Sequence, residues 1–347
     1  MIDFQWHVCR EGYRWFQGEA YKELPPTGET HHGRYLIPAA LDRHRRYIFT
    51  KLNSGLFRTV CATPLTGEGI RQFAEEYGPL CYGPFTVKVP TSTPGAFTLY
   101  CGDNGGDSFE GWIATLRALR WAVALWDMIH TEDTQQLRQY IRWDNQHTVS
   151  FRDGRNYVCI ASLTSPLVHP DLLQSFGEQA PLLTPGDVIE PAREYLRTLV
   201  NRHLEGQVDV RLLWRLSNKR TPSIPDRHVH FQWCPKDLRA ALWLQLAMTI
   251  EGEKEYRQCA QCEAWFEVNP PGDRVDKHYC STKCRSAAYR ARQEKTHLLY
   301  SEGTSLADIA FQLHTDIPTV QRWLSTTVPA NRRRPRGRPR SQPAEPA

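Results

Sequence analysis

Residues 256–292 read YRQCAQCEAWFEVNPPGDRVDKHYCSTKCRSAAYRAR, and this stretch decides the fold of the C-terminal part of the chain. It contains two cysteine pairs, Cys259 with Cys262 and Cys280 with Cys284. The short gap in the first pair makes a tight turn that aims both sulfurs at one ion, and the second pair spans one helical turn. Seventeen residues separate the pairs, which is enough for the chain to fold back. The spacing therefore predicts one structural Zn²⁺ held by four thiolates.

A helix is expected to begin immediately after the third cysteine. Ser281 is a good N-cap residue because its hydroxyl accepts a backbone N–H from the first turn. The positive end of the helix dipole would then help to keep the neighbouring thiols ionised. A disulfide, an iron–sulfur cluster and a redox pair at Cys259 and Cys262 are alternative explanations of the cysteines. A disulfide fits less well because the sequence shows no sign of secretion, and an iron–sulfur cluster fits less well because its usual compact cysteine spacing is absent.

The same residues resemble a known family. The pattern Cys-x-x-Cys, the aromatic pair Trp265 and Phe266, and the run Tyr-Cys-Ser-x-x-Cys-Arg-x-Ala-Tyr-Arg-x-Arg from Tyr279 resemble the treble-clef zinc fingers of bacterial CGNR-type proteins. The resemblance implies a zinc-dependent fold that binds DNA. Where that family has Cys-Gly-Asn-Arg, this chain has Cys-Arg-Ser-Ala, so the metal ligands and the basic helix are the features that carry over.

Positive charge is concentrated in the C-terminal part of the chain. The 347 residues carry a formal net charge of +5, and from Lys254 onward there are 16 Lys and Arg against 10 Asp and Glu. The preceding residues are close to neutral, with 27 against 28. This asymmetry is expected if the C-terminal part contacts phosphate. On the helix after the cysteines we expect Arg285 and Arg292 to share one face, with Arg290 and Lys295 beside them, although a basic helix can also simply be solvated.

Residues 301–327 read as two short helices joined by a tight turn. Apolar positions recur at helical spacing at Leu306, Ile309, Ala310 and Leu313, and again at Val320, Trp323 and Leu324. Asp316 is placed to cap the second helix. The arrangement resembles the homeodomain-like helix-turn-helix units of recombinases and bacterial regulators, except that His314 stands where the turn usually has glycine. The second helix would present four residues to a major groove: Ile317, Gln321, Arg322 and Ser325. A two-helix packing hairpin is the alternative.

The tail at residues 328–347 is too polar to form a core. It contains Pro-Arg-Gly-Arg-Pro at 335–339, which matches the core of an AT-hook. Prolines keep such a segment extended, and a glycine lets arginines enter the narrow minor groove of A·T tracts. The predicted contacts are Arg336, Gly337, Arg338 and Arg340. A nonspecific basic tail is the alternative.

Residues 1–253 predict an α+β domain, because helical and strand patterns occur without regular βαβ alternation. Helices are expected at 67–78, 112–126, 188–204 and 238–247, and strands within 84–101, 148–163, 208–216 and 228–233. Residues 112–142, with the element at 73–80, resemble a segment found ahead of such zinc fingers in uncharacterised bacterial proteins. Three further units are predicted after this domain: the zinc finger with its basic helix at 254–300, the helix-turn-helix at 301–327 and the tail at 328–347.

The predicted function is that of a zinc-containing, sequence-preferring protein that binds double-stranded DNA, most consistent with a bacterial transcription regulator. The N-terminal domain would then bind a small-molecule effector or form a homodimer. No phosphate-binding loop, nucleophile elbow or metalloprotease motif is found, so the chain is not expected to be an enzyme. The start lacks a signal-peptide pattern and no segment is long and apolar enough to span a membrane, which favours the cytoplasm.

Two other classes of function stay open. A DNA-processing or mobile-element enzyme would need catalytic residues in the N-terminal domain, where His228, His230 and Asp226 are the nearest to an acid–base group. An RNA-binding or protein-interaction module is the other class, because zinc modules of this kind serve those functions too.

Overall fold

The computed structural model of the chain describes residues 5–21, 30–41, 44–48, 55–81, 85–100, 106–144, 148–153, 156–162, 184–216, 227–268 and 277–325. It forms two compact units. The N-terminal unit contains Met1–Arg257 and Ala264–Asp276, and the C-terminal unit contains Gln258–Glu263 and Lys277–Ala347. The domain boundaries predicted at 253/254 and 300/301 stay predictions, because compact units are not the same as independently folding domains.

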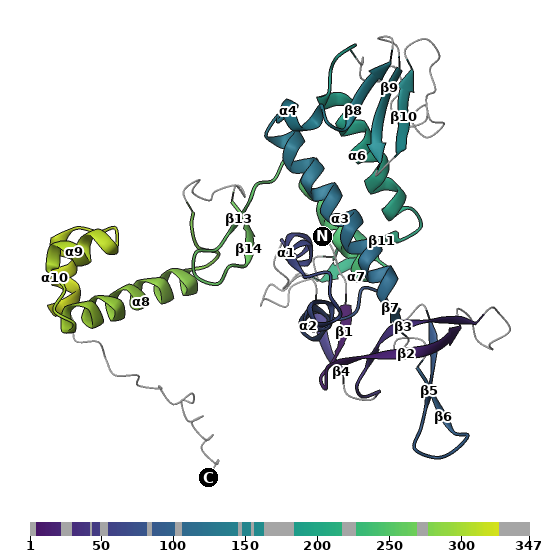
Figure 1. Cartoon of the computed structure of the whole chain (residues 1–347), viewed down its shortest axis with the longest axis horizontal. Coiled ribbons are helices and arrows are strands. Elements are labelled where there is room, and N and C mark those ends of the chain that lie inside the picture. Colours follow the sequence, from purple (N-terminus) through teal and green to yellow (C-terminus); the bar gives the residue numbers. More distant parts are fainter. Residues whose placement is uncertain are drawn as a thin grey trace. The chain divides into compact units, whose positions relative to one another are not determined.

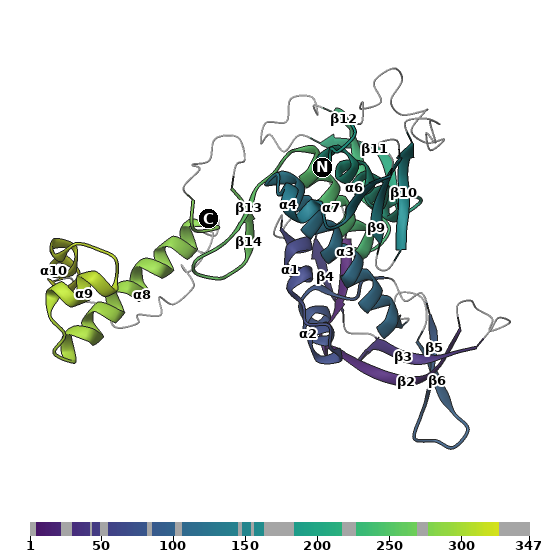
Figure 2. The same ribbon diagram turned by 45° about the horizontal axis from the view of Figure 1, so that its top comes forward.

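The N-terminal unit is built around one long helix, α3 (Phe109–His130), which crosses its centre (Figures 1 and 2). Its buried residues lie on several sides, from Trp112 and Leu116 near the start to Met128 and Ile129 near the end. A helix that is apolar on most of its surface must be surrounded by other elements. The helices that share one hydrophobic core with it are α1 (Leu56–Ala62), α2 (Gly67–Tyr77), α4 (Thr134–Leu137), α6 (Ile189–Leu204) and α7 (Leu238–Glu251).

A five-stranded antiparallel sheet lies beside these helices, with strand order β6-β5-β2-β3-β7. Within β3, Leu36 belongs to the main core, whereas Tyr35 and Ile37 belong to a smaller core with Val87 and Tyr100. This alternation follows from the two-residue period of a strand, which sends neighbouring side chains to opposite faces. The strands are β2 (Tyr13–Tyr21), β3 (His31–Pro38), β5 (Thr86–Pro90), β6 (Phe97–Tyr100) and β7 (Asp107–Ser108).

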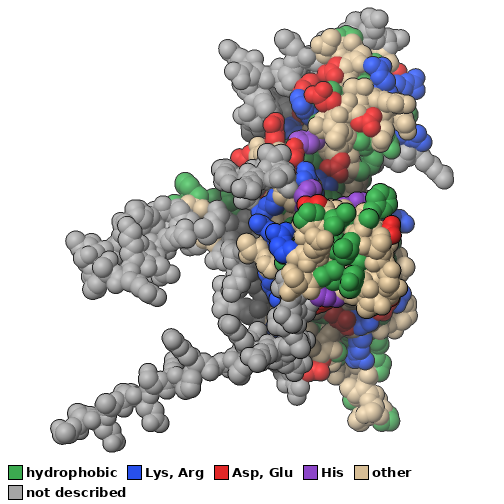
Figure 3. Space-filling model, turned by 90° about the vertical axis from the view of Figure 1, so that its left-hand side faces the viewer, with side chains coloured by type: hydrophobic (Ala, Val, Ile, Leu, Met, Phe, Trp, Pro, Cys, Tyr) green, Lys and Arg blue, Asp and Glu red, His purple; other side chains and the backbone are tan. Residues whose placement is uncertain are grey.

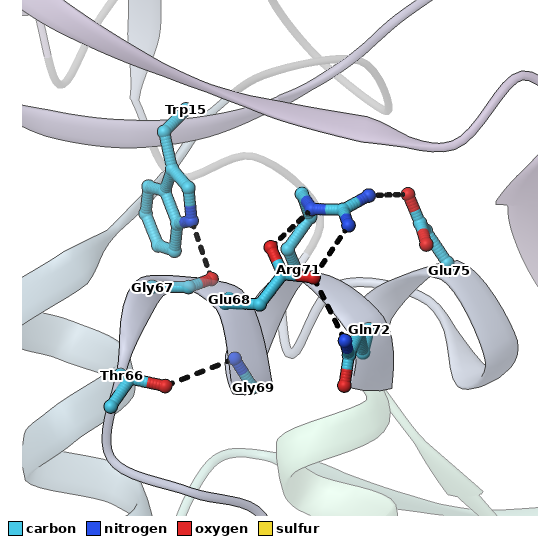
Figure 4. Close-up of polar contacts among 8 residues, drawn as sticks. All are labelled: Trp15, Thr66, Gly67, Glu68, Gly69, Arg71, Gln72 and Glu75. Atoms are coloured by element: carbon cyan, nitrogen blue, oxygen red, sulfur yellow. Dashed lines mark hydrogen bonds and ion pairs between the residues drawn. The ribbon is translucent and has the colours of Figure 1, made fainter.

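Helix α2 (Gly67–Tyr77) is fixed at both its start and its exposed face (Figure 4). The hydroxyl of Thr66 accepts a backbone N–H from the first turn at 3.1 Å, as an N-cap residue does. The indole N–H of Trp15 donates to the first carbonyl of the helix at 2.7 Å, which ties α2 to the sheet. On the exposed face, the guanidinium of Arg71 forms ion pairs with Glu68 and Glu75.

Four smaller sheets complete the strands of the described residues. β8 (Ile141–Asp144), β9 (Thr148–Asp153) and β10 (Asn156–Ser162) form one, in which Asp153 pairs with Asn156. β11 (Val208–Leu216) and β12 (Arg227–Pro235) pair along their full length. β1 (Gln5–Cys9) pairs with β4 (His44–Ile48). The α+β class, the four predicted helices and the predicted strand regions of this unit are confirmed.

Two short strands within the predicted zinc finger pack with the N-terminal unit. β13 (Tyr256–Gln258) and β14 (Trp265–Glu267) form a two-stranded sheet. The Tyr256 ring meets Phe57 of α1 edge-on at 5.3 Å, and the guanidinium of Arg58 lies 5.2 Å from the Trp265 ring. Tertiary packing therefore divides the predicted finger between the two units.

The C-terminal unit consists mainly of three helices. They are α8 (Thr282–Ser301), α9 (Leu306–Gln312) and α10 (Ile317–Ser325) (Figure 1). Ile309, Ala310 and Val320 form a small buried core, against which Leu299 of α8 packs. The long helix α8 thus supports the helix pair that follows it.

Candidate metal centre and nucleic-acid interface

The four predicted metal ligands come together at one point of the C-terminal unit. The sulfurs of Cys259, Cys262, Cys280 and Cys284 all lie within 4.8 Å of one another. The sulfur of Cys280 lies 3.6 Å from that of Cys262 and 3.5 Å from that of Cys284. A tetrahedral site with metal–sulfur bonds of about 2.3 Å requires sulfurs about 3.8 Å apart. The cluster is therefore of the right size to hold one metal ion.

The first cysteine pair is held by a tight backbone turn. The N–H of Glu263 donates to the Cys259 carbonyl at 2.8 Å, and Glu263 has a φ of 59°. A non-glycine residue takes this left-handed conformation only at a cost, so the turn depends on the contacts around it. The N–H of Ala260 donates to the His278 carbonyl at 3.0 Å, which joins the segments that carry the two pairs.

The second pair is positioned by the start of α8. The Ser281 hydroxyl accepts the backbone N–H of Cys284 at 3.2 Å, so the predicted N-cap is confirmed. This cap places the last cysteine in the first helical turn and leaves the third just before the helix. The cap therefore fixes the positions of both cysteines relative to the first turn of α8.

The thiols differ in their readiness to ionise. Burial alone would raise the pKa of Cys259, but backbone N–H groups of Cys280, Gln261 and Cys262 outweigh it and lower this pKa to about 6. The Cys280 N–H to Cys259 sulfur distance is 3.4 Å. Burial raises the pKa of Cys280 to about 12, and its hydrogen bond with Cys284 acts in the same direction. One negative charge among close sulfurs disfavours a second, and a bound cation would remove that opposition.

The chemistry of this donor set is that of a closed, structural metal site. All four cysteines are free thiols rather than disulfides. Four protein ligands fill a tetrahedral coordination sphere, so no position is left for a reacting water or a substrate. An ion there would join the turn of the first pair to the start of α8.

The basic residues of α8 are exposed, but they do not share one face. Arg285, Arg290, Arg292 and Lys295 are all exposed. In a helix of 3.6 residues per turn, Arg290 points about 140° away from Arg285, whereas Arg292 points within about 20° of it. Five residues are nearly one and a half turns, so Arg290 points away from the face that Arg285 and Arg292 share. The guanidinium of Arg292 also donates to the Tyr279 hydroxyl at 3.0 Å.

The helix pair α9–α10 packs with the residues that its apolar spacing indicated. Val320 and Trp323 are buried, and the Trp323 indole N–H donates to the Tyr289 hydroxyl of α8 at 2.9 Å. The carboxylate of Asp316 accepts the Thr319 N–H at 2.6 Å, as predicted for a cap. His314 adopts the left-handed conformation that the turn requires, with a φ of 48°.

The second helix leaves the four residues predicted to face DNA on its surface. Ile317, Gln321, Arg322 and Ser325 are all exposed. Phe311, at the end of α9, is 82% exposed. The surface of α9 and α10 is therefore mixed, with apolar and polar groups side by side. Figure 3 shows one face of the molecule, on which hydrophobic side chains gather in one area.

Some predicted site residues cannot be placed. The tail residues Arg336, Gly337, Arg338 and Arg340 lie outside the described residues, as does Asp226. For His228 and His230 the structure describes the backbone of β12 and not the side chains.

Sequence reasoning missed three residues that support this site. Tyr279 and Tyr289 hold Arg292 and Trp323, and Glu263 completes the first turn. The presence of tyrosines just before and within the basic helix, at positions 279 and 289, could have suggested that they support it. The Tyr289–Trp323 contact joins residues 34 positions apart, and no local pattern announces it.

Comparison with known proteins adds no relative to this picture. No protein-family model, no curated protein and no solved structure matches the chain. Within the part of the chain that the structure describes, no helix has both the length and the apolar composition needed to cross a bilayer.

Proposed function

We propose that this protein binds double-stranded DNA through its C-terminal unit and regulates transcription in bacteria, with one structural Zn²⁺ in the four-cysteine site. The observation that carries the proposal is the cysteine cluster at the start of α8, which would hold an exposed basic helix against the turn of the first cysteine pair. Zinc is the ion proposed because four thiolates in a closed tetrahedral set suit it best.

The proposed DNA contacts divide by chemistry. Arg285 and Arg292 share a face of α8 and are assigned to phosphate, which positions the protein without reading sequence. Gln321 and Arg322 of α10 are assigned to base edges, because glutamine suits adenine and arginine suits guanine. In this assignment α9 and α10 act as a helix-turn-helix, whose second helix enters the major groove.

The principal test is selection of bound fragments from random duplex DNA by the purified full-length chain. Recovery of a common sequence supports the proposal. Absence of any enrichment, together with no binding in dilute salt, contradicts it. Competition by structured RNA separates the RNA-binding alternative, and a divalent-metal-dependent cleavage assay separates the DNA-processing enzyme. We propose that no cleavage occurs.

Matched variants distinguish residues that recognise the base sequence from residues that contact phosphate. Gln321→Ala should reduce discrimination among sequences with little change in salt dependence, whereas Gln312→Ala, an exposed glutamine at the end of α9, should change neither. Arg285→Ala should weaken binding to all sequences and lower the salt slope by about 1. Arg290→Ala, on the opposite side of α8, should have the smaller effect. Equal losses for both arginines would contradict the assigned face.

The tail supplies a separate proposal about the minor groove. Deleting residues 331–347 should weaken binding to A·T-rich duplex more than to G·C-rich duplex, because arginines favour narrow A·T minor grooves. Equal loss on both would reduce the tail to plain electrostatics. We assign the protein to the cytoplasm, where bacterial DNA lies, and assign effector binding or dimerisation to the N-terminal unit.

A further inference from the structure

The β11–β12 hairpin carries an apolar face that is open to solvent. In its register, Val210 lies opposite Trp233 and Leu212 lies opposite Phe231. Opposite residues, and alternate residues along one strand, share a face of an antiparallel pair. These four side chains therefore form one surface, here called the ribbon face. Their exposed fractions are 51% and 42% for the first pair and 61% and 69% for the second.

The opposite face of the hairpin is the one turned toward the N-terminal unit. Gln232 is only 4% exposed and Cys234 is half-buried, and β12 contacts α7. On β12 the usual order is thus reversed, with the polar Gln232 inside and the apolar Phe231 and Trp233 outside. A two-stranded ribbon is marginally stable alone and is normally stabilised when an apolar face is covered. Within the part of the chain that the structure describes, the ribbon face has no such cover.

We infer that two copies of this chain associate through the ribbon face, packing their β11–β12 hairpins face to face about a twofold axis. An interface of this kind requires a patch that is complementary to itself. The ribbon face meets that requirement because none of its four side chains is charged, so two copies bring apolar surface against apolar surface without like-charge repulsion.

The size of the ribbon face fits an interface between proteins. Its four side chains leave on the order of 400 Å² of apolar surface open, which is comparable to the largest patch on an ordinary monomer. A stable dimer buries about 800 Å² per partner. The ribbon face would therefore supply about half of the interface as its apolar core, and the surrounding hairpin and its neighbours would supply the rim.

The inference is independent of DNA binding. The ribbon face belongs wholly to the N-terminal unit, whereas the proposed DNA contacts belong to the C-terminal unit. If both proposals hold, a dimer would carry two DNA-binding units, as proteins that recognise paired half-sites do. The test is made without nucleic acid, so failure of either proposal leaves the other to be judged separately.

The experiment is sedimentation velocity of the full-length, zinc-saturated chain from about 1 to about 100 µM, a range that covers ordinary dimer affinities. We expect a concentration-dependent dimer for the wild type. Phe231→Glu and Phe231→Lys should each weaken dimerisation by about 100-fold, as a charge at the centre of an apolar interface does. An equimolar mixture of the two variants should recover dimers, because the opposite charges meet across the axis. Circular dichroism checks that both variants are folded.

The matched control is Phe97→Glu, which places the same charge on a phenylalanine of β6 that is 49% exposed and away from the hairpin. It should dimerise like the wild type. A wild type that stays monomeric over the whole range overturns the inference, as do Phe231 variants that dimerise normally. A monomer that sediments with lipid vesicles would assign the ribbon face to a membrane instead.

Discussion

Replacing Asp107 with asparagine should remove a pH dependence of stability that is built into the core of the N-terminal unit. Asp107 lies in β7, is 4% exposed, and accepts the backbone N–H of Cys81 at 3.1 Å. Burial raises the pKa of its carboxyl group to about 7, against the backbone N–H groups of Cys81 and Leu80, which lower it. Nearby Asp237 raises this pKa further and Arg239 lowers it.

The magnitude follows from the difference between the folded and unfolded pKa. An unfolded aspartate titrates near about 3.9, and each pKa unit corresponds to about 1.4 kcal/mol, so keeping Asp107 ionised in the folded state costs on the order of 4 kcal/mol. The pKa is raised on folding, so this group's contribution to stability is complete below about pH 4 and is lost as pH rises through about 7. Between about pH 5.5 and about pH 8.5 the change is about 2 kcal/mol.

The assay compares thermal unfolding of the wild type and Asp107→Asn across that pH range, in zinc-containing buffer. For a unit of this size, about 2 kcal/mol corresponds to about 4 to 8 °C in Tm. The wild type should gain that much relative to the variant on going from alkaline to acidic buffer. Asp209→Asn, which removes a half-exposed carboxylate, should show no such difference. A difference between wild type and Asp107→Asn that is constant with pH would refute the reasoning.

Three further changes test the C-terminal unit. Cys280→Ala should lose the metal ion and unfold the site, because metal binding supplies on the order of 10 kcal/mol to such units; metal analysis that finds one zinc per chain would contradict this. Trp323→Ala should lower the free energy of unfolding by about 3 to 5 kcal/mol and Tyr289→Phe by about 1, measured by urea unfolding; equal effects would mean that the hydroxyl alone matters. His314→Gly should raise stability by up to about 1 kcal/mol, because glycine takes a left-handed conformation without strain, and His314→Ala should give no gain in the same assay.

Residue spacing was enough to predict features that depend on a few neighbouring residues. The metal ligands are paired at short intervals. One tight backbone turn brings the first pair together, and one helical turn brings the second pair together, whatever surrounds them. The caps at Ser281 and Asp316 act over three residues, and the structure has both. The long apolar helix α3 was also predicted, since helical periodicity is a local property.

Spacing alone did not predict the first four strands or the short helix α1. Along β2, exposed and buried residues follow one another irregularly, because different elements cover different parts of the strand. The sequence of β2 therefore shows no clear alternation of polar and apolar residues. Helix α1 has only seven residues, too few for a helical period to stand out. The placement of these strands and of α1 depends on partners far along the chain. For example, the backbone N–H of Phe57 in α1 donates a hydrogen bond to the side chain of Gln245, which lies 188 residues away in the sequence.

The sequence by itself indicated the four-cysteine site, the cap at the start of α8 and the apolar seam of the α9–α10 pair, because each is built from short motifs whose residues lie within one helical turn or one tight turn. Only the tertiary structure decided that the β13–β14 hairpin packs with the N-terminal unit, that Asp107 is sealed in the core, and that the ribbon face is left open. Burial is a property of what packs against a residue, and those neighbours come from distant parts of the chain.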